Sequence, residues 1–316
     1  MEEEAKCLEL AIRKYPHHPL FPRLVEHVIF RFHESSSHDR LAAYHFALLT
    51  LRHLPQIYSN PDHQKLIDSM KDNWEVLPFF NPSAVTVQLA FFLARPIPLL
   101  EIIETGPYVE DAFYALLELG CIKMIKENSR LVEYPEIQTA LLAHEKGIKA
   151  ALDTHPESPR LLHSLFQMAL DTNQAKEILP FVKDDLQRLT ALLLTGNLNE
   201  AGAIFEKYPL EQLSSEISPF FPLFGCYLWA TEGESIAKAH FNAALEMPYP
   251  RTASLLGLFL MGKIDLKKGW IEHALLWEKI QLFRQLLLFY RSIGKQKDAE
   301  LVLKGLKKLK NATENG

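Results

Sequence analysis

Histidines clustered near the start of the chain are the side chains best suited to chemistry. His38, His45 and His53 are spaced by seven and eight residues, and Asp39 lies beside the first of them. Zinc sites usually hold the metal with four ligands in a closed arrangement, and these three histidines have no cysteine partner and no closely spaced pair. We therefore expect no metal site, and we interpret the three as partly exposed structural residues.

The motifs that carry phosphate transfer or hydrolysis are missing. The sequence has no Gly-x4-Gly-Lys-Ser/Thr loop, no Gly-x-Gly-x2-Gly cradle, no Gly-x-Ser-x-Gly elbow, and no kinase His-Arg-Asp or Asp-Phe-Gly motif. His33-Glu34 and His144-Glu145 are not followed by a second histidine at the metalloprotease spacing. The sequence therefore predicts a chain with no catalytic residues and no cofactor.

The composition is that of a globular protein that can bury a core. Hydrophobic residues make up 48% of the 316 and charged residues 23%, and the net charge of −5 gives no general attraction to nucleic acid. Three widely spaced cysteines argue against a disulfide framework. The start of the chain is acidic, and no apolar stretch approaches the ~20 residues that span a bilayer. We expect a cytoplasmic protein that binds neither membrane nor nucleic acid.

The charge is unevenly distributed along the chain. Residues 263–310 contain twelve Lys/Arg and five Asp/Glu, so a basic end follows an acidic body. This asymmetry indicates that the C-terminal third meets something anionic. Its last stretch fits either a membrane-surface helix or the terminal helix of a stack, whose outer face must be polar, and we favour the second. Lysines there lie opposite leucines: Lys304, Lys307, Lys308 and Lys310 against Leu303, Leu306 and Leu309.

Helical periodicity dominates the sequence. Leu286, Leu287, Tyr290 and Ile293 form a stripe at i, i+1, i+4 and i+7, whereas β-branched residues rarely alternate with polar ones. Prolines fall between such segments and not inside them. Segments of roughly 10–18 residues joined by short loops are typical of antiparallel helix pairs. The sequence predicts an all-α fold.

One pair of predicted helices carries a specific pattern. The first helix has large residues, and the second has a small residue followed by an aromatic one. It reads Phe221-x2-Phe224-Gly225-x2-Leu228, followed by Ala237-x3-Phe241-x2-Ala244 and a closing Pro248. The pattern resembles the tetratricopeptide repeat. This resemblance implies a solenoid of antiparallel helix pairs, in which Gly225 and Ala237 let two helices touch.

The same register recurs on either side of this pair. The small second-helix residues Ala201, Ala237, Gly269 and Ala299 are 36, 32 and 30 residues apart, close to the ~34-residue period of the family. We therefore divide the chain into a helical region of degenerate repeats, residues 1–158, and tetratricopeptide-like repeats with a C-terminal capping helix, residues 159–316. Residues 56–130 fit no period.

The resemblance also implies a function. Tetratricopeptide solenoids bind a protein or peptide along a concave groove lined by their first helices, so we expect a non-catalytic interaction scaffold. The mixture of cations and apolar residues in this groove would suit a partner with acidic and hydrophobic residues. The residues expected to line it are Lys183, Trp229, Arg251, Leu258, Met261, Arg284 and Arg291.

A second resemblance leads to a different function. Residues 283–303, with a Leu-rich helix, Tyr290-Arg291 and an Ile293-Gly294 turn, resemble the C-terminal helical region of PknD-type bacterial serine/threonine protein kinases. This implies that the chain is an accessory region of a larger multidomain enzyme. The sequence gives no oligomeric state.

Overall fold

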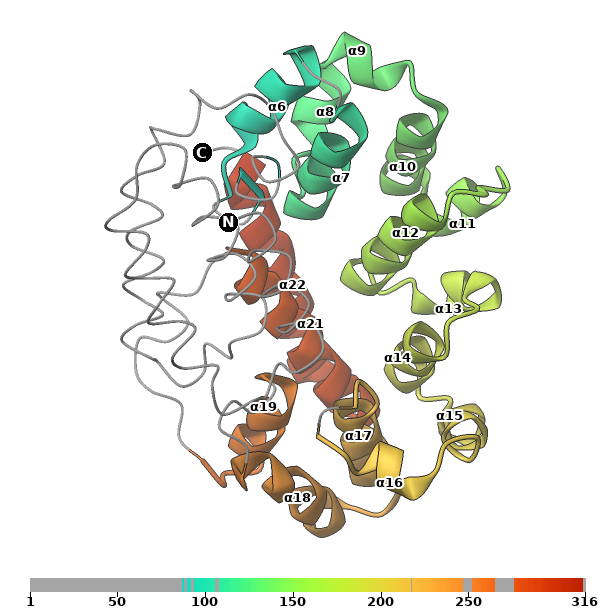
Figure 1. Cartoon of the computed structure of the whole chain (residues 1–316), viewed down its shortest axis with the longest axis vertical. Helices are drawn as coiled ribbons and strands as arrows, with labels where there is room; N and C mark the ends of the chain where they lie inside the picture. Colours follow the sequence, from blue (N-terminus) through green and yellow to red (C-terminus); the bar gives the residue numbers. More distant parts are fainter. Residues whose placement is uncertain are drawn as a thin grey trace, which may run out of the picture.

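The computed structural model describes residues 94–105, 108–216, 218–246, 252–264 and 276–314, together with Val87, Ala90 and Phe91. All regular structure within these residues is helical, as the sequence predicts, and they contain no strand. The first group of helices forms the upper and right-hand part of the ring of helices in Figure 1. It consists of α6 (Pro96–Thr105), α7 (Val109–Leu119), α8 (Ile122–Glu127), α9 (Ser129–Val132), α10 (Pro135–Lys146), α11 (Ile148–Leu152), α12 (Pro159–Asp171), α13 (Ala175–Ile178) and the 3-10 helix η2 (Leu179–Phe181).

The second group continues the ring through its lower part and then turns back (Figure 1). It consists of α14 (Asp185–Thr195), α15 (Leu198–Phe205), α16 (Leu210–Leu213), α17 (Phe221–Thr231), α18 (Glu234–Asn242), the 3-10 helix η3 (Ala243–Glu246), α19 (Thr252–Leu260), α21 (Leu276–Ser292) and α22 (Gln296–Glu314).

Local sequence explains where several of these helices begin and end. The Ser158 hydroxyl accepts a hydrogen bond from the backbone N–H of Leu161 at the start of α12, and Pro159 occupies the first turn, where its missing N–H costs nothing. Asp184 caps α14 in the same way, accepting from the backbone N–H of Gln187 at 2.9 Å. Gly196 ends α14 in the left-handed conformation that glycine adopts without strain.

Consecutive helices pack in pairs at three of the units that the repeated pattern gives, those with Ala201, Ala237 and Ala299, whereas Gly269 of the fourth lies outside the described residues. The pattern at residues 221–244 forms α17 and α18, which pack closely together. Phe241 is fully buried, and a Cβ atom added at Gly225 would overlap its ring, so this seam needs glycine. Ala237 also has no exposed surface. The small-against-aromatic contact predicted from the sequence is therefore present.

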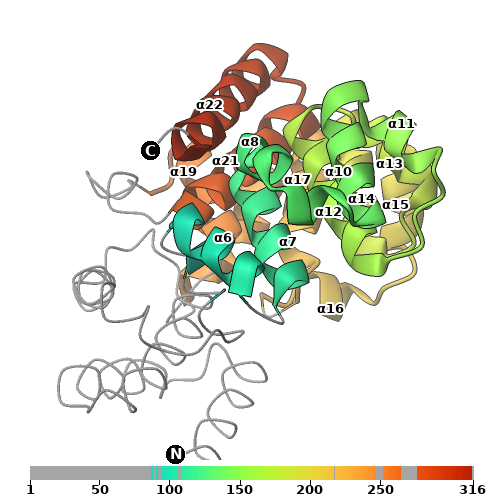
Figure 2. The same cartoon turned by 90° about the horizontal axis from the view of Figure 1, so that it is seen from above.

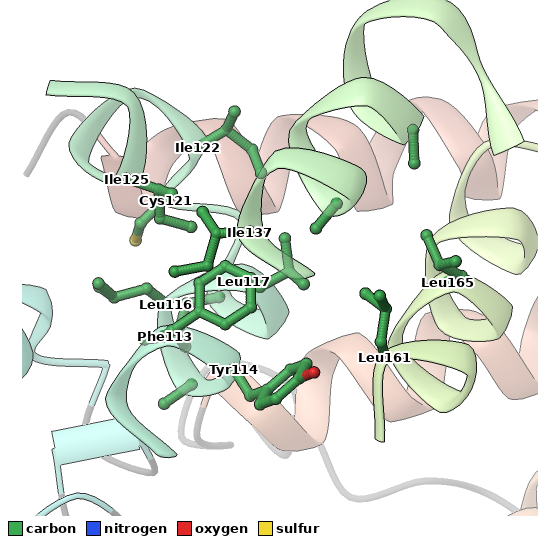
Figure 3. Packing of buried hydrophobic residues seen from close by; sticks show 14 of the residues in the cluster. Phe113, Tyr114, Leu116, Leu117, Cys121, Ile122, Ile125, Ile137, Leu161 and Leu165 are labelled. Atoms are coloured by element: carbon green, nitrogen blue, oxygen red, sulfur yellow. The ribbon is translucent and has the colours of Figure 1, made fainter. Parts of the chain in front are cut away.

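A continuous apolar core joins the first described helices to those that follow. Figure 3 shows part of it, where Phe113 and Leu116 of α7 lie near Ile137 of α10, and Tyr114 of α7 lies toward Leu161 of α12. The same cluster of buried residues continues to Val182 and Ala191. The predicted division after residue 158 therefore coincides with no gap in the core, and it stays a prediction.

The C-terminal helix pair lies against the ring and closes it. Helix α21 packs on α14, α17 and α19, and α22 packs on α21 and also meets α8 and α12. In Figure 1 the two helices run from the lower part of the ring back toward α6 and α8. The sequence predicts a terminal capping helix here. In the structure that helix also contacts elements that lie more than 120 residues earlier in the chain.

Candidate functional site

Four charged side chains from four helices meet where the C-terminal pair closes the ring. Glu118 belongs to α7, Asp171 to α12, Arg284 to α21 and Lys310 to α22. Their side chains are 23%, 9%, 7% and 15% exposed, respectively, so the charges are largely removed from water. We call this set the closure cluster.

Arg284 is the centre of the closure cluster. Its Nε and Nη2 atoms donate to the two oxygens of Asp171, each at 2.8 Å, and its Nη1 atom donates to Oε1 of Glu118 at 2.6 Å. The Nζ atom of Lys310 donates to Oδ2 of Asp171 at 2.6 Å. A guanidinium that binds one carboxylate through two parallel bonds is held in a fixed orientation as well as by charge. Two cations thus balance two carboxylates.

The positions of the two carboxylates explain why they need these cations. Glu118 lies in the last turn of α7, and Asp171 is the last residue of α12. A carboxylate is disfavoured there, because the C-terminal end of a helix carries a partial negative charge. Arg284 and Lys310 come from distant segments and offset both the carboxylates and the helix ends.

A glycine lets α22 approach closely enough to bring Lys310 into the cluster. Gly120 follows α7 with φ of 83°, a left-handed conformation that L side chains rarely adopt. A Cβ atom at this position would lie 2.8 Å from the Cβ of Lys310. Both the turn and the helix contact therefore depend on glycine.

The pKa values of the cluster follow from burial and charge together. Burial raises the pKa of the Glu118 carboxyl, but the charges of Arg284 and Lys310 lower it by more, so it lies below its ordinary value. The Asp171 pKa is lowered in the same way, by Lys310 and by its hydrogen bonds with Arg284 against the effect of burial. Burial alone would lower the Arg284 pKa, but the two carboxylates raise it. Both carboxyl groups and the guanidinium are therefore ionised at neutral pH.

The closure cluster positions helices and offers no reactive group. A buried ion pair often stabilises a fold no more than apolar residues of the same volume, whereas removing one partner is strongly destabilising. Its clearest role is to fix which elements meet and in what register. Here it joins α21 and α22 to α7 and α12.

Three of the predicted groove residues are packed inside the chain. Leu258 is 0% exposed, Met261 6% and Arg284 8%. Trp229 is half-buried, and its ring packs edge-on against Phe289 of α21 at 5.9 Å between centroids. These side chains therefore face other helices of the chain, and not an open groove.

The two remaining predicted residues that the structure describes, Lys183 and Arg291, lie in different surroundings. Lys183 is exposed and lines a shallow hollow of about 480 Å³ between the start of α14 and α15. Arg291 is half-buried and donates to the side chain of Gln296. Arg251 lies outside the described residues. The basic stripe expected from Arg251, Arg284 and Arg291 is therefore not assembled among the described residues.

Sequence reasoning missed Glu118 and Asp171, although one signal was available, and it wrongly grouped Lys310 with the lysines of the polar outer side, whereas Lys310 binds Asp171. Carboxylates usually favour the first turn of a helix, so an acid in the last turn of a predicted helix indicates a cation supplied from elsewhere. Which cation it is cannot be found locally, because Arg284 is 113 residues from Asp171 and 166 from Glu118.

The described residues contain neither a metal-binding group nor a helix that could span a membrane. They contain no group of three or more His, Cys, Asp or Glu that could hold a metal ion, and the three histidines near the start of the chain lie outside them. No helix in the described part of the chain is both long and apolar enough to cross a bilayer. Burial raises the pKa of the Cys226 thiol, which therefore stays protonated and unreactive.

The chain is similar over nearly its whole length to bacterial protein kinases. It is 31% identical over 345 aligned residues to serine/threonine-protein kinase PknD of Protochlamydia amoebophila, an alignment that covers 93% of this chain and 35% of that relative. It is 27% identical to PknD of Chlamydia pneumoniae, with 95% of this chain and 37% of the relative covered. For PknD of Chlamydia muridarum the identity is 24%, over 94% and 37%.

These comparisons extend the resemblance seen at residues 283–303 to almost the entire chain. The chain spans about a third of the length of the curated relatives it matches. No family model matches it, so membership of the tetratricopeptide family is not shown. No solved structure matches it either. Nearly all of this chain is thus similar to about one third of each of these PknD kinases.

Proposed function

We propose that this chain is a non-catalytic helical region of a larger serine/threonine protein kinase of the PknD type, where it binds a partner protein. One observation carries the proposal: the similarity covers 93% of this chain but only 35% of the Protochlamydia relative, which is named a kinase. An alignment that covers nearly all of one chain and about a third of another is expected when the first corresponds to one region of the second.

The chemistry of the chain supports a non-catalytic role. Protein kinases place a Gly-rich loop and a lysine on strands and use a His-Arg-Asp catalytic loop and an Asp-Phe-Gly magnesium site. The sequence has none of these motifs, and its described residues are all helical or irregular. Phosphate transfer in the relatives would then belong to the two thirds that this chain does not match.

The helix pairs support a role in binding. We interpret them as tetratricopeptide-like repeats whose last pair has folded back onto the first helices of the array. Arrays of this kind present extended surfaces to protein partners. Because Leu258, Met261 and Arg284 of the predicted groove are buried, we favour surfaces that are exposed in this closed form.

The first experiment removes the matched region from the Protochlamydia relative and compares the product with the full-length kinase. We expect both to phosphorylate a generic basic protein at similar rates, because the catalytic residues are elsewhere. We expect the shortened kinase to lose phosphorylation of the cellular proteins that the full-length kinase modifies, since the binding region is gone. Phosphoprotein mass spectrometry measures the second effect.

The present chain alone serves as the companion sample. It should transfer no phosphate from ATP to itself or to the basic protein. Transfer by the chain alone would refute a non-catalytic role. Unchanged phosphorylation of cellular proteins by the shortened kinase would refute the role in partner binding.

A further inference from the structure

The outward side of α22 carries an unusual concentration of unbalanced positive charge. Lys297, Lys304 and Lys308 lie at helical spacing on one side of the helix, with Lys307 beside them, and all four are exposed. Figure 2 shows α22 at the outer edge of the molecule. We call these four lysines together with Leu301 the basic face.

The lysines of the basic face lack partners among the described residues. None of the four forms an ion pair or side-chain hydrogen bond there, whereas Lys310 on the same helix is bound to Asp171. Glu300, three residues from Lys297 and four from Lys304, is the single exposed carboxylate between Lys297 and Lys308. Protein surfaces usually intersperse both signs of charge, and this chain has a net charge of −5. The side of α22 that carries these lysines therefore has a net positive charge, four lysines against Glu300, in a chain that is acidic as a whole.

An apolar side chain lies in the middle of these cations. Leu301 is 65% exposed, and it is four residues from Lys297, three from Lys304 and seven from Lys308. A single exposed leucine is ordinary by itself. Surrounded by cations, it has the arrangement of a small interface, in which an apolar centre is enclosed by a polar rim.

We propose that the basic face of α22 docks an acidic segment of a partner protein that carries an apolar residue among its carboxylates. A helix with carboxylates at i, i+7 and i+11 and a leucine at i+4 would repeat the spacing of Lys297, Lys304, Lys308 and Leu301. The biological meaning of this surface rests on the proposed binding function, but the chemical claim is tested separately.

The interior of the protein holds this surface in place. The inward side of α22 is fixed by Ala299, Val302 and Leu306, which are buried, and by Lys310 in the closure cluster. The helix has 19 residues and is therefore about 28 Å long. A long helix anchored along one side presents its other side without further ordering, which favours binding.

Two other anionic partners fit less well. A helix that lies in a membrane surface buries a continuous apolar side in the lipid, but the apolar side of α22 is already packed against α21. Single-stranded nucleic acid is usually held by aromatic side chains that stack on the bases, and α22 contains no aromatic residue. Both remain as outcomes of the test.

The test measures binding of a fluorescent synthetic helical peptide with glutamates at i, i+7 and i+11 and a leucine at i+4. We expect the chain to bind it, with affinity that falls as salt rises, because exposed charges are screened. The double variant Lys304→Glu, Lys308→Glu should bind about ten-fold or more weakly, since attraction becomes repulsion at two positions. Leu301→Ser should also weaken binding, but without changing its salt dependence.

Matched controls separate this surface from overall charge. The double variant Lys146→Glu, Lys176→Glu makes the same charge change at exposed lysines on α10 and α13 and should bind the peptide within about two-fold of the unaltered chain. Circular dichroism should show equal helix content in all variants. The same peptide with glutamine for glutamate should not bind.

Several results would overturn the proposal. These are absence of peptide binding, equal weakening by the two double variants, or preferential binding of phosphatidylserine vesicles or of an oligonucleotide. The kinase comparison above is independent: if it fails while the peptide binds the basic face, the docking surface stands and the kinase assignment falls. If the peptide fails while the kinase comparison succeeds, the partner binds elsewhere.

Discussion

The inward and outward sides of α22 carry the same residue types in opposite circumstances. Lys310 is bound to a buried carboxylate, whereas Lys308, two residues earlier, is exposed and has no partner among the described residues. Leu306 is 1% exposed and Leu301 is 65% exposed. Local sequence hardly differs between the members of each pair. What differs is the presence of α8, α12 and α21 on one side of the helix. A lysine-rich helix can therefore stabilise the fold through one side while its other side stays exposed and available for binding.

The largest expected effect comes from removing the centre of the inward side. Arg284→Ala would leave Asp171 and Glu118 as buried carboxylates with most of their compensating charge gone. Breaking a buried ion pair in this way typically costs about 3–5 kcal/mol. Urea unfolding followed by circular dichroism measures the loss.

Arg188→Ala is the matched control for this prediction. Arg188 forms an ion pair with Glu200 at 3.8 Å, and its side chain is 42% exposed. Exposed pairs contribute about 0–1 kcal/mol. A similar cost for both arginine substitutions would mean that the closure cluster contributes no more than a surface pair.

The two leucines of α22 provide a second comparison. Leu306→Ala should destabilise the protein by about 2–5 kcal/mol, because it leaves a cavity in the contact around α22. Leu301→Ala should change the free energy of unfolding by less than about 0.5 kcal/mol, because the side chain is mostly in water. If Leu301→Ala is as costly as Leu306→Ala, the outward side is covered and the proposed docking surface is lost.

The two lysines should differ by a smaller amount. Lys310→Ala removes one of the two cations at Asp171, and we expect a cost of about 1–3 kcal/mol. Lys308→Ala should have an effect within about 0.5 kcal/mol. Thermal unfolding at low and high salt measures both. Equal midpoints for the two variants would show that Lys310 is not part of the closure cluster in solution.

Acid should weaken the inward side of α22 and leave its outward side unaffected. The pKa values of Glu118 and Asp171 lie below their ordinary values of 4.5 and 3.8. A depressed folded-state pKa gives stability that is present above the unfolded-state pKa and lost as pH falls through the folded-state pKa. We therefore expect the free energy of unfolding to decrease as the pH is lowered past about 4.5.

Glu118→Gln tests the source of this acid sensitivity. The variant should be less stable at neutral pH and should lose less further stability on acidification, because one of the two carboxylates no longer titrates. The free energy of unfolding measured from pH 7 to pH 3 distinguishes the variants. A curve parallel to that of the unaltered chain would assign the acid sensitivity to other groups.

Much of the local structure was predictable because it depends on short-range patterns. The spacing at residues 221–244 placed Ala237 at a close helix contact and Phe241 in the seam, and both are fully buried. Pro159 and Gly196 lie at helix ends because one lacks a backbone N–H and the other tolerates positive φ. These effects act within a turn or two, so the sequence alone reveals them.

Whether an individual cation is buried and paired, or exposed, was not predictable in the same way. Arg284 was expected in an open groove because its repeat register places it on a first helix. The structure buries it, since the last helix pair packs against earlier ones and brings Glu118 and Asp171 to it. The position of the last helix pair depends on how all the preceding helices pack on one another. A local sequence pattern does not reveal this.

The sequence by itself determined the all-α class, the helix pairs and the small residues in their seams, because these follow from periodicity and backbone chemistry. Only the tertiary structure decided that α22 meets α8 and α12, and hence which lysine is neutralised and which face is left basic. The physical reason is the separation along the chain between the residues that interact. Helix formation is set by neighbours three or four residues away, whereas a charge buried between helices is paired by groups more than a hundred residues distant.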